Sequence, residues 1–220
     1  MQNVALTPGG WERILIDAYP RRFDSYPAFL QAADHLYSGP DAANPCGYAN
    51  ISLFFPQQCA DGTELTVSFR FEGDAAPLIV LANALEPDEA GRLRYGDYIE
   101  AVVWKNGMNI WRHWIDGEQP HWHKLCGLTY PVDGSDMQTL SVRRVGSRLF
   151  VRHGAVDLNL LVPALPDSLC YGIDACEGVC RFYRLTLRTP GTDEDRAKPE
   201  RDRERQTGSV CRMPAPRSDG

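Results

Sequence analysis

Residues 97–116, with the sequence DYIEAVVWKNGMNIWRHWID, carry the clearest fold signal in the chain. Two runs rich in apolar, β-branched and aromatic residues flank the pair Asn106-Gly107. This pair tolerates the positive φ angles of a tight type I′ turn, which joins antiparallel strands well. The segment therefore predicts a β-hairpin with strands over 97–105 and 108–115.

Alternating and uniformly apolar runs predict further strands on both sides of this hairpin. Over 64–72, apolar residues occupy one face and polar residues the other, as in a half-buried strand. Residues 138–145 and 148–153 predict a second hairpin joined by Gly146-Ser147. Strands are also predicted at 11–17, 77–82, 170–173 and 181–188, a polar loop at 86–96, and either a short helix or a strand at 29–36.

Frequent short strands and turn pairs, without a long amphipathic helix, predict the all-β fold class. A sandwich or barrel of this kind often reaches about 200 residues, so we expect a single domain over residues 1–189. Residues 190–220 are charged and almost free of apolar side chains, so ordering them would bury little surface. We expect this segment to be a disordered tail.

The composition narrows the possible partners and chemistries. A formal net charge of −6 and the lack of a Lys/Arg-rich block argue against a nucleic-acid partner. No apolar run reaches the roughly 20 residues of a membrane span, and the first residues do not resemble a secretory signal. We therefore expect a cytoplasmic protein without a membrane partner. Nucleotide-binding glycine loops, nucleophile elbows and His-Glu-x-x-His runs are missing, which leaves carboxylates and histidines as possible catalytic groups.

The seven cysteines are an odd number, and in a reducing compartment most should be buried free thiols. Two sets of residues have metal-ligand chemistry, but neither has a strong signature. Cys170, Cys176 and Cys180 lack a second ligand pair, and His121 with His123 form a spaced pair of a kind that is common without metal. We expect neither a metal nor a cofactor.

Aromatic, acidic and basic residues concentrate between residues 97 and 124, which indicates a ligand site. Strand alternation places Tyr98 and Glu100 on one face, and across the predicted turn Trp111 and His113 share a face that can lie beside them. Indole rings stack on the apolar faces of sugars, while carboxylate and imidazole groups supply directional hydrogen bonds. The candidate catalytic residues are Glu100 and His113, and the candidate ligand-binding residues are Tyr98, Trp111, Arg112, His121, Trp122 and His123.

The sequence allows more than one role for Trp104, Trp114 and Glu100. Trp104 and Trp114 fit core packing as well as ligand binding, because tryptophans on strands are often buried. Glu100, which lies in an otherwise apolar strand, either pairs with Arg112 or Arg152 or faces an open cleft.

The chain resembles the concanavalin A-like lectin/glucanase superfamily over about residues 64–187. The resemblance is carried by the hairpin at 140–151, LSVRRVGSRLFV, and by Tyr171-Gly172-Ile173 followed by RFYRLTL at 181–187, which look like the strand pairs that close many such domains. It implies a jelly-roll β-sandwich of two antiparallel sheets, shared by lectins, glycan-binding modules, glycoside hydrolases and polysaccharide lyases. The Glu-x-Asp-x-Glu run of the retaining glucanases is missing here, and residues 97–100 replace it only in part.

From the residues and the resemblance together, we expect a protein that binds an oligosaccharide or polysaccharide on the concave face of the sandwich. A carbohydrate-active enzyme is the first alternative. A glycoside hydrolase needs a second carboxylate about 5 Å from Glu100 for retention, or somewhat farther for inversion. The candidates for it are Asp97, Asp116 and Glu118.

A polysaccharide lyase would use a histidine or tyrosine base, with Arg112 to neutralise a uronate carboxylate. His113, His121 and Tyr98 supply such bases. A further alternative is a protein-interaction module that binds its partner through exposed aromatic residues.

Overall fold

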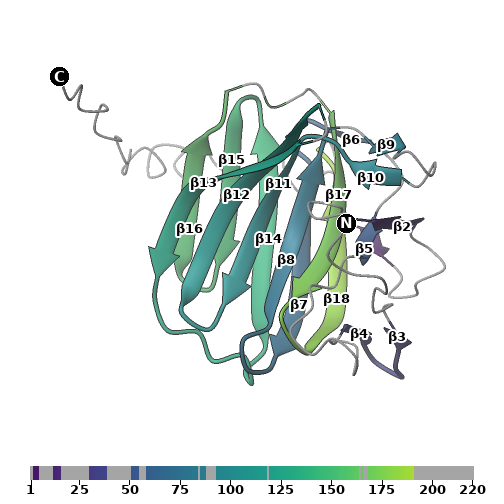
Figure 1. The fold of residues 1–220 in the computed structure, drawn as a ribbon. Coiled ribbons are helices and arrows are strands. Elements are labelled where there is room, and N and C mark those ends of the chain that lie inside the picture. Colours follow the sequence, from purple (N-terminus) through teal and green to yellow (C-terminus); the bar gives the residue numbers. More distant parts are fainter. Residues whose placement is uncertain are drawn as a thin grey trace. The chain divides into compact units, whose positions relative to one another are not determined.

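Two β-sheets lie face to face in the computed structural model of the chain (Figure 1). The structure describes residues 2–4, 12–15, 30–38, 51–54, 58–83, 85–87, 93–117, 119–163, 165 and 168–190. Within these residues no helix has the length and apolar character needed to cross a membrane. The expected tail lies outside the described residues except for Pro190, so its disorder and the extent of the single domain stay predictions.

The first sheet has eight strands, all paired antiparallel. Its hairpin at Gly146-Ser147 confirms the predicted one, because Val145 pairs directly with Arg148. The strands in spatial order are β16 (Val156–Leu161), β15 (Arg148–His153), β14 (Gln138–Val145), β7 (Glu64–Phe71), β18 (Cys180–Arg188), β4 (Leu36–Ser38) and β3 (Leu30–Gln31), with β1 (Gln2–Val4) also paired to β18.

The second sheet has ten strands and is antiparallel except where β10 pairs with β2. In spatial order it contains β13 (Gln119–Thr129), β12 (Gly107–Asp116), β11 (Tyr98–Trp104), β8 (Ala76–Ala82), β17 (Ser168–Cys176), β5 (Ile51–Phe54), β2 (Glu12–Leu15), β10 (Leu93–Tyr95) and β9 (Leu85–Pro87), with β6 (Cys59–Ala60) also paired to β17. The expected all-β fold class is therefore confirmed.

Two local predictions change. The segment 86–96 is not only a polar loop, because β9 and β10 pair within it. The segment 29–36, which fitted either a helix or a strand, contributes to the paired strands β3 and β4. In both cases pairing with a neighbouring strand decides the structure of a run too short to decide it alone.

The main core lies between the sheets and follows from strand alternation. On β11, Ile99, Ala101 and Val103 are buried in it. The uniformly apolar strand β8 is buried on both faces: Ile79 belongs to the main core, while Val80 belongs to a second buried cluster on the opposite side of the ten-stranded sheet. We call this opposite side, which is turned away from the eight-stranded sheet, the outer face.

The hairpin between β11 and β12 is confirmed, but the predicted turn type is wrong. Trp104 pairs with Gly107, so the turn consists of Lys105 and Asn106. Glycine 107 has a φ of 137°, whereas Asn106 is not among the residues with positive φ, so the angles of a type I′ turn are not met. Glycine is still required at 107, because a Cβ atom there would lie 1.9 Å from the backbone oxygen of Leu128.

Candidate functional site

The strand register of the ten-stranded sheet brings side chains from four strands into rows on the outer face. As strand alternation predicts, Tyr98, Glu100, Trp111 and His113 lie on this face. From β8 to β13, one row contains Val80, Glu100, Trp111 and Lys124, and the next contains Ala82, Tyr98, His113 and Trp122.

A β-bulge fixes the β13 end of these rows. The register between β12 and β13 shifts between Ile110, which pairs with Cys126, and Trp111, which pairs with Lys124. Leu125 is therefore the extra residue of the bulge, and the shift places the lysine opposite Trp111.

Glu100 and His113 form a hydrogen-bonded pair on the outer face. The Nε2 atom of His113 lies 3.0 Å from Oε2 of Glu100, and the two side chains keep 16% and 13% of their surface exposed. The Tyr98 ring stacks on the imidazole with 4.6 Å between ring centroids. Glu100 thus pairs with neither arginine considered from the sequence, and Arg152 instead pairs with Asp157 at 3.2 Å. The result is an oriented imidazole with one edge near solvent.

Three polar atoms on this face are buried and have no hydrogen-bond partner: the Tyr98 hydroxyl, Nδ1 of His113 and Nε1 of Trp104. Buried polar atoms in folded proteins nearly always have a partner, and leaving one without costs about 1–3 kcal/mol. The outer face therefore carries hydrogen-bonding capacity that the described residues leave unused.

A second carboxyl group lies on the outer face, at Asp174 of β17. It is 2% exposed, and its Oδ1 accepts a hydrogen bond of 2.7 Å from the backbone N–H of Ala175. Burial raises the pKa of Asp174 well above its ordinary value, and the nearby Glu100 carboxylate raises it further. Burial, and then Glu100, also raise the pKa of the Tyr98 hydroxyl.

Asp174 is not among the site residues predicted from the sequence. Its only local signal is a single acidic residue in the apolar run of β17. The carboxylates selected instead lie elsewhere: Asp97 binds Arg112, Asp116 is exposed at the end of β12, and Glu118 lies outside the described residues.

Arg112, His121 and His123 lie on the opposite face of the β12–β13 hairpin, so the structure does not bring them together with Glu100. Arg112 forms two hydrogen bonds with Asp97, of 2.5 and 3.1 Å, and its guanidinium lies 5.6 Å from the centroid of Trp114. His121 stacks on the same indole at 5.3 Å. Strand alternation separates these three residues from Glu100.

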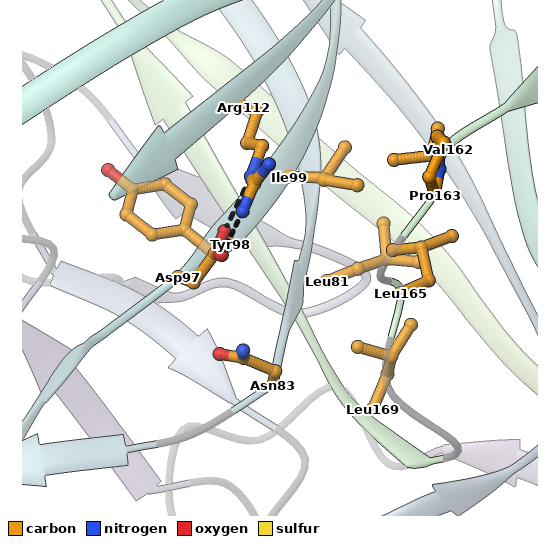
Figure 2. A pocket seen from close by; sticks show the side chains of 10 residues that line it. All are labelled: Leu81, Asn83, Asp97, Tyr98, Ile99, Arg112, Val162, Pro163, Leu165 and Leu169. Carbon is orange, nitrogen blue, oxygen red and sulfur yellow. Dashed lines mark hydrogen bonds and ion pairs between the residues drawn. The ribbon is translucent and has the colours of Figure 1, made fainter. Parts of the chain in front are cut away.

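A small cavity lies beside the Arg112–Asp97 pair (Figure 2). Leu81, Ile99 and Val162 are among its apolar lining, and the Tyr98 hydroxyl is directed away from it. Its volume of about 20 Å³ suits a single water molecule, whereas sites for small ligands span about 300–1,000 Å³. This cavity is not a glycan site.

The candidate metal ligands do not assemble in the part of the chain that the structure describes. No group of three or more histidine, cysteine or acidic side chains there could hold a metal ion. Five of the seven cysteines are described, and all five are free thiols, as expected. Burial raises the pKa of the Cys59 thiol to about 11.

No protein-family model matches the sequence, and no curated protein matches it. Solved structures do match the fold. The carbohydrate-binding module CBM66 of Bacillus subtilis aligns with a TM-score of 0.56 at 10% identity, covering 82% of this chain and 96% of the module.

Two further solved structures align over most of this chain. The exoplasmic/lumenal domain of VIP36 in its Ca²⁺/mannose-bound form has a TM-score of 0.54 at 15% identity, with 84% of each chain covered. A GH16 protein of the Bacteroides ovatus mixed-linkage glucan locus, in complex with its product, has a TM-score of 0.51 at 8% identity, covering 81% of this chain and 94% of the other. Together with the two-sheet topology, these similarities establish that the chain is a jelly-roll β-sandwich of the concanavalin A-like lectin/glucanase fold.

Proposed function

We propose that this protein binds an oligosaccharide or polysaccharide on the outer face of the ten-stranded sheet, which we take as the concave face of the jelly roll. The observation that carries the proposal is the Glu100–His113 pair, beside which two buried polar atoms, Nδ1 of His113 and the hydroxyl of the stacked Tyr98, have no hydrogen-bond partner. Sugar hydroxyls both donate and accept hydrogen bonds, so one sugar ring can satisfy donors and acceptors together. The pair is not fully enclosed, since its two side chains keep 16% and 13% of their surface exposed.

Trp111 supplies the apolar part of such a site. It lies directly opposite Glu100 in the register and is half-buried, so part of the indole stays near the surface. Stacking of a sugar on the indole beside a hydrogen-bonding carboxylate is the combination that a ring with polar edges and apolar faces needs. Solved proteins of this fold whose descriptions name a carbohydrate-binding module and bound mannose also support the proposal.

Calorimetry and tryptophan fluorescence over a panel of neutral and acidic oligosaccharides test this proposal. Trp111→Ala should weaken binding by about tenfold or more, equivalent to about 1.4 kcal/mol. Trp114→Ala, the matched control on the opposite face of the hairpin, should leave the affinity unchanged. Absence of binding across the whole panel, or equal losses in both variants, would contradict the proposal.

A carbohydrate-active enzyme is the second candidate, because Asp174 places a second carboxyl group on the face of Glu100. Glycoside hydrolysis uses two carboxyl groups, one of them protonated, and burial raises the pKa of Asp174, which favours its protonated form. The lyase alternative loses Arg112 as its cation, since Arg112 lies on the other face.

Release of reducing ends from polysaccharides tests the hydrolase. Glu100→Gln and Asp174→Asn should each abolish turnover while the protein still binds the glycan. Turnover equal to that of the unmodified protein in either variant would remove that residue from catalysis.

We further propose a cytoplasmic location, without a nucleic-acid or membrane partner. The net charge of −6 and the free thiols of the described cysteines support it. Thiol labelling of the protein in intact cells should be equal before and after reduction, and labelling that requires reduction would contradict this location.

A further inference from the structure

We infer that the glycan is acidic, and that Lys124 binds the carboxylate of a uronic acid unit stacked on Trp111. This inference rests on the proposed function and names the chemical class of its ligand. It starts from the contact of the Lys124 side chain with the indole of Trp111.

Lys124 places its ammonium group over the indole of Trp111. The Nζ atom lies 4.6 Å from the ring centroid, and the side chain is exposed. Among the described residues Lys124 forms no ion pair, whereas Lys105 pairs with Asp74 and Arg112 pairs with Asp97. A cation–π contact at an exposed position is weak, so this ammonium is available to an anion.

The row through Trp111 has opposite charge on the two sides of the indole. Glu100 lies on the β11 side of the indole, and Lys124 lies on the β13 side. The Glu100 carboxylate accepts hydrogen bonds from the hydroxyl groups of a uronic acid. It repels the carboxylate of the same sugar, which the Lys124 ammonium attracts. The row therefore fixes one orientation of an acidic sugar, with its carboxylate toward β13.

The position of Lys124 over the indole also discriminates against neutral sugars. A ring that stacks on this face of Trp111 must displace the ammonium group. When a neutral sugar displaces the ammonium group, Lys124 loses its contact with the indole and gains no new partner. A uronic acid instead offers the ammonium group a charge-assisted hydrogen bond. Because β13 is the edge strand of the sheet, a longer acidic chain can continue past Lys124 without meeting another strand.

Calorimetric titration with equal-length oligomers of galacturonic, glucuronic, mannuronic and guluronic acid tests the inference. The methyl ester of each oligomer is the matched control, because it keeps the ring and removes the charge. At least one acid should bind, and about tenfold or more tighter than its ester. Lys124→Met should remove this difference and Lys124→Arg should keep it, while Lys105→Met should change neither affinity.

The outcomes separate this inference from the function on which it rests. Binding of neutral oligosaccharides or of esters at the affinity of the acids, or an unchanged acid preference in Lys124→Met, overturns the inference and leaves glycan binding standing. Failure of every acidic and neutral oligosaccharide to bind overturns both.

Discussion

Removing the Tyr98 hydroxyl should stabilise the folded protein and weaken its ligand binding. The hydroxyl oxygen is buried without a hydrogen-bond partner, and the residue is 5% exposed. An unsatisfied buried polar group costs about 1–3 kcal/mol, so Tyr98→Phe should raise the free energy of unfolding by about 1–2 kcal/mol. In a protein of this size each kcal/mol corresponds to about 2–4 °C in melting temperature.

Tyr171→Phe is the matched control for this experiment. Tyr171 is also buried, but its hydroxyl donates a hydrogen bond of 2.8 Å to the backbone oxygen of Thr63. Losing that bond should lower stability by about 0.5–1.5 kcal/mol, opposite in sign to the Tyr98 variant. Urea denaturation followed by tryptophan fluorescence measures both changes.

Ligand titration of the same variants completes the test. If the Tyr98 hydroxyl serves the glycan, Tyr98→Phe should bind any oligosaccharide identified for the protein more weakly, by about tenfold for one lost hydrogen bond. Tyr171→Phe should bind it normally. A loss of stability in Tyr98→Phe like that of the control would contradict the prediction, because it would show that the hydroxyl has a partner in the free protein.

Three further predictions concern stability. Gly107→Ala should lower the free energy of unfolding by about 3 kcal/mol or more, because its Cβ atom would clash with the backbone oxygen of Leu128. Gly117→Ala, whose Cβ atom meets open space at a φ of 61°, should lower it by only about 1–2 kcal/mol. Similar melting temperatures of the two variants would contradict this prediction. Burial lowers the pKa of His153 below 6.5, so the unfolded state binds the proton more readily than the folded state. The free energy of unfolding should therefore be highest above about pH 6.5 and fall as the pH drops toward the lowered pKa. His153→Gln should flatten this dependence in urea titrations between about pH 5 and 7.5. Asp174→Asn should change stability at neutral pH by less than about 1 kcal/mol, because burial raises the pKa of Asp174 and favours its neutral form. A loss of about 3 kcal/mol or more by calorimetry would mean that the group is ionised.

Most of the sheet structure could be predicted from local patterns. The two-residue period of strands is visible in the sequence, and so are the faces it creates, such as the shared face of Tyr98 and Glu100. Both predicted hairpins form, because their strands are joined by only a few residues. Local patterns did not predict the turn type, since Gly107 also lies close to the backbone of Leu128 in the next strand.

The composition of the site depended on contacts between distant segments. Asp174 comes to the face of Glu100 because β17 and β11 pair with opposite edges of β8, and no local pattern specifies that arrangement. The partner of Glu100 proved to be His113 rather than an arginine, although both types were available nearby in the sequence.

Local sequence patterns specify the all-β class, the main hairpins and the side chains that share a face, because these follow from the alternation of a single strand and from short turns. The packing of the sheets is needed to bring Asp174 to the face of Glu100 and to pair Arg112 with Asp97 away from them. It also placed Lys124 beside Trp111, through the bulge at Leu125. Strand order, register shifts and burial are set by the packing of the whole sandwich, where each pairing is stabilised by contacts with strands far away in the sequence.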